Sequence, residues 1–359
     1  MFAEIIGWGK CAPPAVLTND DIASFMDTSD EWIYTRTGIK QRHISHVPCS
    51  ELARVASERA IACADIDASE IDLVIFGSTT HDEFIPNTAS IIVNAIGAVN
   101  ASGFDLNSAC TGFLYSLNVA TDMIKAGSVK TVLVIGAEKL SRFMDWGKRE
   151  SAVLFGDGGG AVVLRATEQA LGLIDAKLSI VPNTRDMLRL PNYGMDLSHK
   201  DLNEYYFSLD FQGQDIFKNA VRGMDEACKD VLQRTGLGKQ DIDFFVPHQA
   251  NVRIIKTLAK RMDFDMDKVM VCVDKYGNTS AGTIPLALCD ALEAGRIKSG
   301  MTIMTASFGA GLTCGAGIIK WGDRITPIAK SDAELPPCKQ SALEIIQPAI
   351  DAAKEKYEF

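Results

Sequence analysis

The chain has 359 residues, of which 47% are hydrophobic and 23% charged, with a formal net charge of −10. This balance is typical of a globular protein and excludes a disordered or collagen-like chain. The acidic surplus argues against a surface that binds nucleic acid as a whole. Nine irregularly spaced cysteines and five histidines predict buried free thiols in a reducing cytoplasm, with neither a disulfide framework nor a metal site.

The first ten residues lack a basic segment followed by an apolar run, so we expect no signal peptide. The longest uncharged stretch, residues 84–104, contains one proline and three asparagines. Such a composition makes a poor membrane span. We therefore expect a cytoplasmic protein without a membrane-spanning helix.

Short runs rich in Val, Ile and Phe alternate with helical patterns, which predicts an α/β layered fold. The strands are expected at 73–76, 131–135, 243–246, 269–273 and 302–304. Helices are expected from Ser50, as the N-cap, to about residue 64, and over 113–124, 281–292 and 341–356. The last of these follows Pro336-Pro337 and is interpreted as an extra C-terminal helix.

Two short segments recur along the chain in the same order. Ile-Asp-Leu-Val-Ile at 71–75 is followed 171 residues later by Ile-Asp-Phe-Phe-Val. Ala-Gly-Ser-Val-Lys at 126–130 is followed 168 residues later by Ala-Gly-Arg-Ile-Lys. The similar offsets indicate two halves of one design.

The glycine-rich segment 156–161 satisfies the pattern G-x-G-x-x-A of nucleotide-binding loops. The residues that follow it, Ala161-Val162-Val163-Leu164, are typical of a strand, whereas a pyrophosphate needs a helix N-terminus at that point. We therefore predict a tight turn between two strands instead of a nucleotide site.

Cys110 lies in Asn-Ser-Ala-Cys-Thr-Gly, directly before the buried helix 113–124. A free cysteine is often an inert core residue. A thiol at a helix N-terminus, however, meets a partial positive charge that favours the thiolate. We therefore predict that Cys110 is a nucleophile with a lowered pKa.

His248 follows the predicted strand 243–246, in Pro-His-Gln-Ala-Asn, where α/β sheets place their chemistry. Asn278, in Tyr-Gly-Asn-Thr-Ser, lies 168 residues after Cys110, which is one of the repeat offsets. The two residues are therefore predicted to occupy equivalent, facing positions. The alternatives are a surface histidine and an ordinary turn asparagine.

These motifs, together with Ser-Phe-Gly-Ala-Gly at 307–311, Thr-Ser-Asp-Glu-Trp at 28–32 and Arg-Thr-Gly-Ile at 36–39, resemble the β-ketoacyl-acyl-carrier-protein synthase III family. The resemblance runs from about residue 3 to residue 321. It implies the thiolase fold, with two similar α/β halves in a layered αβαβα arrangement, and a homodimer. The expected divisions are 1–170, carrying the cysteine; 171–322, carrying the histidine and asparagine; and a C-terminal extension, 323–359.

The resemblance also implies an activity without a permanently bound cofactor. Acyl-CoA acylates Cys110, and malonyl-acyl-carrier protein is then decarboxylated and condensed to a 3-oxoacyl-carrier protein, which initiates fatty acid synthesis. His248 and Asn278 donate hydrogen bonds to the malonyl thioester carbonyl. The oxyanion hole is formed by the backbone N–H groups of Cys110 and Ala310. Ala310 stands where the family has glycine, and would be strained at a positive φ.

Six positions match CoA-binding residues of the family, among them a tryptophan and an arginine that enclose the adenine. They are Thr28, Trp32, Arg36, Arg149, Gly213 and Asn251. Without the resemblance, Trp32 would be interpreted as packed against the core. Ile85 matches a gate residue that reaches into the partner's acyl pocket and is Phe in acetyl-preferring members. The smaller side chain predicts that chains longer than acetyl are accepted.

Arg253, Lys256 and Lys260 share one helical face by their i, i+3 and i+7 spacing. Together with Lys218 they match or adjoin basic positions of the family that contact the carrier protein. We therefore predict a docking surface for an acidic carrier protein, against the simpler interpretation of a solvated helix face.

Two alternatives remain open. The first is a thiolase-fold enzyme with another Claisen chemistry, such as the joining of two long acyl chains or the synthesis of a secondary metabolite. The second is a non-catalytic partner subunit. Subunits of that kind tend to lose part of the Cys, His and Asn set, which is complete in this sequence.

Overall fold

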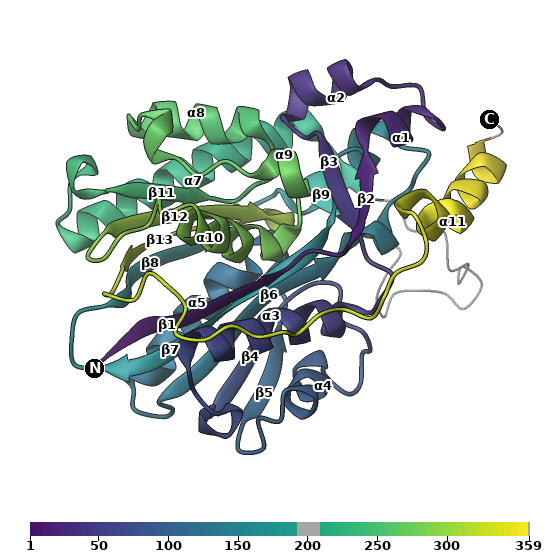
Figure 1. The fold of residues 1–359 in the computed structure, drawn as a ribbon. Coiled ribbons are helices and arrows are strands. Elements are labelled where there is room, and N and C mark those ends of the chain that lie inside the picture. Colours follow the sequence, from purple (N-terminus) through teal and green to yellow (C-terminus); the bar gives the residue numbers. More distant parts are fainter. Residues whose placement is uncertain (192–208, 358–359) are drawn as a thin grey trace.

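A nine-stranded mixed sheet forms the centre of the computed structural model, which describes residues 1–191 and 209–357 (Figure 1). One half of the sheet contains β1 (Phe2–Cys11), β7 (Asp157–Thr167), β6 (Thr131–Lys139), β4 (Leu73–Gly77) and β5 (Ser102–Leu106), in that spatial order. The other half contains β8 (Gly172–Ile180), β13 (Thr313–Lys320), β12 (Thr302–Gly309) and β11 (Phe244–Pro247). The halves meet where β1 pairs with β8, at Ala3 and Gly172, the stretch at which we propose to divide them.

The two halves repeat one arrangement. β4 runs parallel to β6, which is antiparallel to β7; β11 runs parallel to β12, which is antiparallel to β13. The starts of β4 and β11, of β6 and β12, and of α5 (Gly112–Lys125) and α10 (Thr283–Glu293) are each 171 residues apart. Just before these two helices, Ala109 and Ser280 have nearly the same positive φ, 49° and 50°. The repeat predicted from the sequence is therefore confirmed.

Three hydrophobic clusters define the layers. Helices α5 and α10 share one cluster with strands of both halves of the sheet, so they form the central layer. Helices α3 (Cys49–Ala64) and α4 (Thr88–Ala95) pack on the outer face of the first half. Helices α7 (Gly213–Thr235) and α8 (Val252–Met262) pack on the outer face of the second half. This is the predicted αβαβα order.

Smaller helices and strands accompany these layers. They are β2 (Ala15–Thr18), α1 (Asn19–Ala23), α2 (Asp30–Thr37), β3 (Gln41–Ile44), α6 (Arg149–Ala152), β9 (Leu188–Arg189), β10 (Asp210–Phe211) and α9 (Val273–Tyr276). The predicted C-terminal helix is present as α11 (Ala342–Tyr357). Within the described ranges, no helix is long and apolar enough to cross a membrane.

The predicted strand at 269–273 is wrong. Within residues 1–191 and 209–357, this run makes a single isolated bridge, between Val269 and Phe245, at the place that β5 occupies in the first half. The reason is a competing side chain. Gln249 donates its amide to the carbonyl of Met270 at 3.1 Å and accepts from the N–H of Cys272 at 2.8 Å. These backbone groups are thereby satisfied without a strand ladder.

Two local predictions are also wrong. Ser50 is not the N-cap of α3, because that helix starts at Cys49 after Pro48, and the Ser50 N–H donates to the carboxylate of Asp82 at 3.2 Å. The segment 156–161 is not a turn, because Asp157 already begins β7. A Cβ at Gly160 would lie 2.9 Å from the Cβ of Pro285, so the glycine lets α10 approach the strand closely.

Candidate active site

Cys110 lies in a short turn, Ala109–Thr111, that leads into α5. The residue is 8% exposed, and its carbonyl accepts a hydrogen bond from Ser307 Oγ at 3.0 Å. Burial raises the pKa of the Cys110 thiol to about 12, and a hydrogen bond with Ser280 only partly opposes this. The predicted lowering of the pKa by the helix N-terminus is therefore wrong for the resting enzyme. The thiol is protonated at neutral pH and needs a proton acceptor.

His248 offers an unprotonated ring nitrogen in the same cavity. Its Nδ1 lies 2.6 Å from Thr283 Oγ1, and the hydroxyl of Thr283 donates to the carbonyl of Ser280 at 2.9 Å. Because the hydroxyl proton is used there, Nδ1 carries the ring proton and Nε2 keeps a lone pair. Burial lowers the pKa of His248 to about 3, so the ring is neutral. Within the described part of the chain, Nε2 is buried and has no hydrogen-bond partner.

Asn278 is fixed by its own loop. Its Oδ1 accepts from the backbone N–H of Ser280 at 2.8 Å, which leaves the amide Nδ2 as the free donor. Its backbone N–H donates to the carbonyl of Leu154 at 2.9 Å. The predicted equivalence with Cys110 is wrong, because the offset of 171 between α5 and α10 makes Ala281 the counterpart of Cys110. Asn278 enters the site from three residues earlier.

Two cavities meet at Cys110. The first, of about 580 Å³, brings together Cys110, His248 and Asn278 and extends past Gly213 and Asn251 to Trp32. The second, of about 620 Å³, is lined mainly by apolar side chains, among them Leu106, Leu140, Phe143 and Leu209, and also includes Ala310. A thiol at this junction can reach a thioester that enters from one side while an acyl chain occupies the other.

The far end of the first cavity carries a stacked trio. The guanidinium of Arg36 lies 4.4 Å, and that of Arg149 4.5 Å, from the ring centroid of Trp32. Ser29 caps α2, accepting from the Trp32 N–H at 3.1 Å. Arg149 also donates to the carbonyl of Asp27 at 2.7 Å. Such a group offers flat cationic and aromatic faces to a planar base.

The other predicted site residues lie in different places. Thr28 does not line either cavity, and its Oγ1 is buried. Ile85 lines neither cavity and is 90% exposed, as a side chain that reaches outward would be. Ala310 is not among the residues with a positive φ, so its backbone does not have the strain that the sequence analysis considered. Neighbouring Gly309 packs so closely that a Cβ would lie 2.6 Å from the backbone nitrogen of Cys110.

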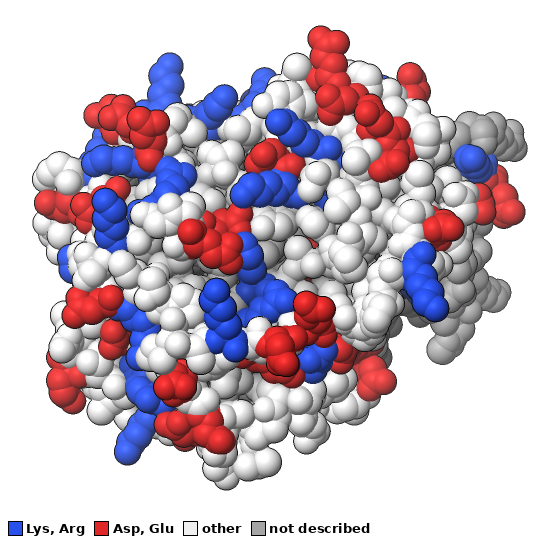
Figure 2. All heavy atoms as spheres, viewed as in Figure 1, with Lys and Arg blue, Asp and Glu red and all other residues white. Residues whose placement is uncertain are grey.

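The basic residues of α8 are arranged as their spacing predicts. Arg253, Lys256 and Lys260 are exposed, whereas Ile255 and Leu258 on the opposite face are buried. Lys218 lies with Arg253 at the first cavity. Figure 2 shows basic and acidic side chains interspersed over the molecular face that carries α8. The basic stripe is therefore a local feature of an acidic protein.

Residues that the sequence reasoning missed complete the site. Glu138 is fully buried and accepts hydrogen bonds from Thr80 at 2.5 Å and Ser280 at 3.0 Å. Desolvation raises the pKa of this carboxyl, although its hydrogen bonds oppose the change. Thr283 orients His248. Glu138 and Thr283 have no sequence motif of their own, because they are recognisable only through their partners.

A thiol, a neutral imidazole and an amide donor at the junction of two cavities, on a repeated αβαβα scaffold, define a condensing enzyme of the acyltransferase type. Residues 104–180 match the family described as 3-Oxoacyl-[acyl-carrier-protein (ACP)] synthase III, and residues 232–321 match its C-terminal counterpart. The chain belongs to the 3-oxoacyl-[acyl-carrier-protein] synthase III family, because a relative named below is 53% identical over nearly its whole length.

That relative is beta-ketoacyl-[acyl-carrier-protein] synthase III 2 of Vibrio cholerae, and the alignment covers 98% of each chain. The synthase III of Xanthomonas axonopodis pv. citri is 41% identical, covering 89% of this chain and 99% of the other. The crystal structure of the synthase III from Aquifex aeolicus VF5 has a TM-score of 0.84 and 39% identity, covering 89% of this chain and 100% of the other. The thiolase fold predicted from the sequence is confirmed.

Proposed function

We propose that this protein condenses an acyl-CoA with malonyl-acyl-carrier protein through an acyl-Cys110 intermediate and so initiates fatty acid synthesis in the cytoplasm. The observation that carries the proposal is the position of the Cys110 thiol between the two cavities, with His248 and Asn278 beside it in the first. The names of the family and of its curated relatives support the same reaction. No permanently bound cofactor is needed for this chemistry, because both substrates are thioesters.

In the first half-reaction, Cys110 Sγ attacks the thioester carbonyl of acyl-CoA. Nε2 of His248 takes the thiol proton as the new C–S bond forms. The bond between the carbonyl carbon and the CoA sulfur then breaks, and the proton passes to that sulfur, giving acyl-Cys110 and free CoA. The backbone N–H groups of Cys110 and Ala310 stabilise the tetrahedral oxyanion. A raised thiol pKa makes this proton transfer necessary.

In the second half-reaction, the malonyl carboxylate leaves as CO₂ and its bonding electrons form an enolate. The enolate carbon attacks acyl-Cys110, the C–S bond breaks, and 3-oxoacyl-carrier protein is released. The Cys110 thiolate then takes a proton from Nε2 of His248 and becomes a thiol again. Nδ2 of Asn278 donates to the enolate oxygen. A malonyl carboxylate in this dry cavity also raises the pKa of His248 and favours a proton on Nε2, so that His248 donates as well.

CoA would lie along the first cavity, with Arg36, Gly213 and Asn251 along its path. Its adenine would insert near Thr28 between Trp32 and Arg149, which are in contact and would separate to admit it. The protein would act as a homodimer in which Ile85 reaches the acyl cavity of the partner. Its exposure of 90%, next to Phe84 at 65%, supports that role, because adjoining exposed apolar side chains mark an interaction site.

An acylation panel tests both the reaction and the predicted chain length. Intact-mass measurement should detect one acyl group per chain, and the acylation efficiency should be higher for hexanoyl- and octanoyl-CoA than for acetyl-CoA. Each methylene that fits contributes roughly 1–3 kcal/mol in an apolar pocket. Ile85→Phe, which refills the gate, should shift the preference towards acetyl-CoA. A wild-type preference for acetyl-CoA would contradict the gate assignment.

The alternative is another Claisen condensation, such as the joining of two long acyl chains or a step in the synthesis of a secondary metabolite. A structure that is 32% identical to this chain, with a TM-score of 0.85, is the priming β-ketosynthase of the R1128 polyketide pathway. Incubating the acylated protein with malonyl-acyl-carrier protein and analysing the product separates the two cases. Release of CO₂ and formation of a 3-oxoacyl-carrier protein support the proposal. Condensation of two long acyl groups with each other, or no condensation at all, would contradict the proposal.

We also propose that the basic stripe of Arg253, Lys256 and Lys260, with Lys218, docks the acidic carrier protein. Reversing two charges, Arg253→Glu with Lys260→Glu, should raise the KM for malonyl-carrier protein several-fold and change Cys110 acylation by acyl-CoA much less. The wild-type KM should rise with salt, because exposed charges are screened within about 10 Å at 0.1 M. Steady-state rates at two salt concentrations measure both effects.

The matched control reverses Lys239 and Lys298 to glutamate. Both are exposed and lie just before β11 and β12, at the strand ends opposite His248, so the net charge changes equally at a distance from the cavity. This control should leave the KM unchanged. Equal effects of the two double reversals would indicate a response to net charge and not to docking.

A further inference from the structure

The C-terminal extension follows a long path across the first half of the molecule. After β13 ends at Lys320, the chain runs over α3 and ends in α11, which packs against β2 and β3 (Figure 1). It therefore connects the second half of the sheet to the elements around α2. These are the elements that carry Trp32.

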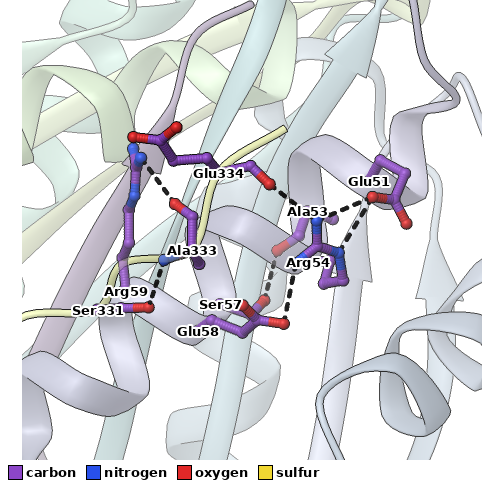
Figure 3. Close-up of polar contacts among 9 residues, drawn as sticks. All are labelled: Glu51, Ala53, Arg54, Ser57, Glu58, Arg59, Ser331, Ala333 and Glu334. Atoms are coloured by element: carbon purple, nitrogen blue, oxygen red, sulfur yellow. Dashed lines mark hydrogen bonds and ion pairs between the residues drawn. The ribbon is translucent and has the colours of Figure 1, made fainter. Parts of the chain in front are cut away.

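Arginine side chains of α3 hold the extended part of this path (Figure 3). Arg59 donates to the carbonyl of Ala333 at 2.9 Å, and Arg54 donates to the carbonyl of Glu334 at 3.1 Å. Arg54 is itself bound by Glu51 and Glu58, each at 3.0 Å. Because the acceptors are backbone carbonyls, these bonds fix the course of the main chain.

Helix α11 packs into the cluster that supports the CoA end of the first cavity. Its buried residues recur on one face, at Ala342, Ile346, Ile350 and Ala353. The same cluster contains Ile33, which adjoins Trp32 on α2, and Trp146, which precedes Arg149 by three residues. The helix therefore shares one hydrophobic cluster with a neighbour of Trp32 and with the segment that leads to Arg149.

The last turn of α11 reaches the loop that carries Arg149. Lys356 Nζ and Tyr357 Oη each donate to Asp145 Oδ2 at 2.8 Å. The other oxygen of Asp145 accepts from the Gly147 N–H at 3.1 Å, and its carbonyl accepts from the Lys148 N–H at 2.9 Å. Asp145 therefore closes the turn that leads directly into α6 at Arg149.

Gly147 makes room for this contact. A Cβ at that position would overlap the ring of Tyr357, so the aromatic ring lies directly over the backbone of the turn. The side chain of Asp145 is only 3% exposed, and a buried carboxylate without partners is costly. Lys356 and Tyr357 supply those partners from the far end of the chain.

We propose that the C-terminal extension is a positioning element for acyl-CoA. Through Lys356, Tyr357 and Asp145 it holds the turn from which Arg149 closes over the adenine on Trp32, and so it sets the affinity for the CoA adenine. This inference rests on the proposed function, in which the adenine enters between those two residues. Neither Lys356 nor Tyr357 touches the cavities.

The double variant Lys356→Met with Tyr357→Phe tests the proposal. The KM for acyl-CoA in Cys110 acylation should rise by about threefold to tenfold, the effect of loosening hydrogen bonds to one charged group. The maximal acylation rate should be unchanged. The KM for the same acyl group on pantetheine, which has no adenine, should also be unchanged. Lys354→Met, at an exposed lysine of the same helical turn, is the matched control and should resemble the wild type.

In an Arg149→Ala background, the double variant should cause no further rise in KM, because both changes act through the same stack. An unchanged KM for acyl-CoA, or an equal rise for acyl-pantetheine, would overturn the proposal. If the double variant does not fold, Tyr357→Phe alone gives the same two comparisons. Failure of the wild type to become acylated at all would instead overturn the proposed function.

Discussion

Replacing Cys110 by alanine or serine should abolish covalent acylation and lower the condensation rate by a factor of roughly 10⁶, as loss of a catalytic nucleophile does in other covalent enzymes. Intact-mass measurement after incubation with acyl-CoA should detect no added acyl group. The fold should persist, because a small side chain fits the same turn and the hydrogen bond from the Ser307 hydroxyl to the Cys110 carbonyl is retained. The midpoint of thermal unfolding measures this.

The matched control is Cys338→Ser. Cys338 is the one cysteine that is not buried in the described part of the chain, so it is the residue most open to adventitious acylation. Its substitution should leave both acylation and condensation unchanged. Acylation of Cys110→Ala at the wild-type rate, or its loss in Cys338→Ser, would show that Cys110 is not the nucleophile.

Much of the fold could be predicted because its signals are local. The strands near 73, 131 and 302 are short apolar runs, buried on both faces of the sheet, and the internal offset is visible in the sequence itself. The run at 269–273 has the same composition, but the amide of Gln249 takes its backbone partners. Such competition depends on a side chain 21 and 23 residues away from the groups it binds, so apolar composition alone cannot reveal it.

The identities of the Cys, His and Asn residues could be predicted, but their protonation could not. The thiol pKa is set by burial between the two halves of the molecule, which outweighs the end of one helix. The tautomer of His248 follows from Thr283, which lies 35 residues along the chain. Both effects arise only when the loops before α5 and α10 meet.

The contact by which the C-terminal extension supports the CoA end of the first cavity could not be predicted, for a similar reason. The extension was recognisable as a helix after two prolines, but its contact with Asp145 joins residues that are 211 and 212 positions apart. Asp145 itself lies between Met144 and Trp146, in a segment without a recognisable motif. A long-range hydrogen bond between common residue types has no pattern that one sequence can display.

The side chain of Asn278 should be needed for the second half-reaction and not for the first. Asn278→Asp keeps an oxygen that can accept from the Ser280 N–H but loses the Nδ2 donor. Asn278→Ala loses the whole amide. Both should lower the rate of condensation by about 10²–10³, the usual effect of removing one donor to a developing oxyanion.

Acylation of Cys110 by acyl-CoA should change by no more than a few-fold in either variant, because that step uses the backbone N–H groups and His248 Nε2. The backbone bonds that Asn278 makes to Leu154 and Gly156 do not involve the side chain, so the loop should keep its course. Single-turnover acylation and CO₂ release from malonyl-carrier protein, measured separately, distinguish the two steps. If acylation falls as far as CO₂ release, then Asn278 shapes the site as a whole and is not the donor to the enolate oxygen.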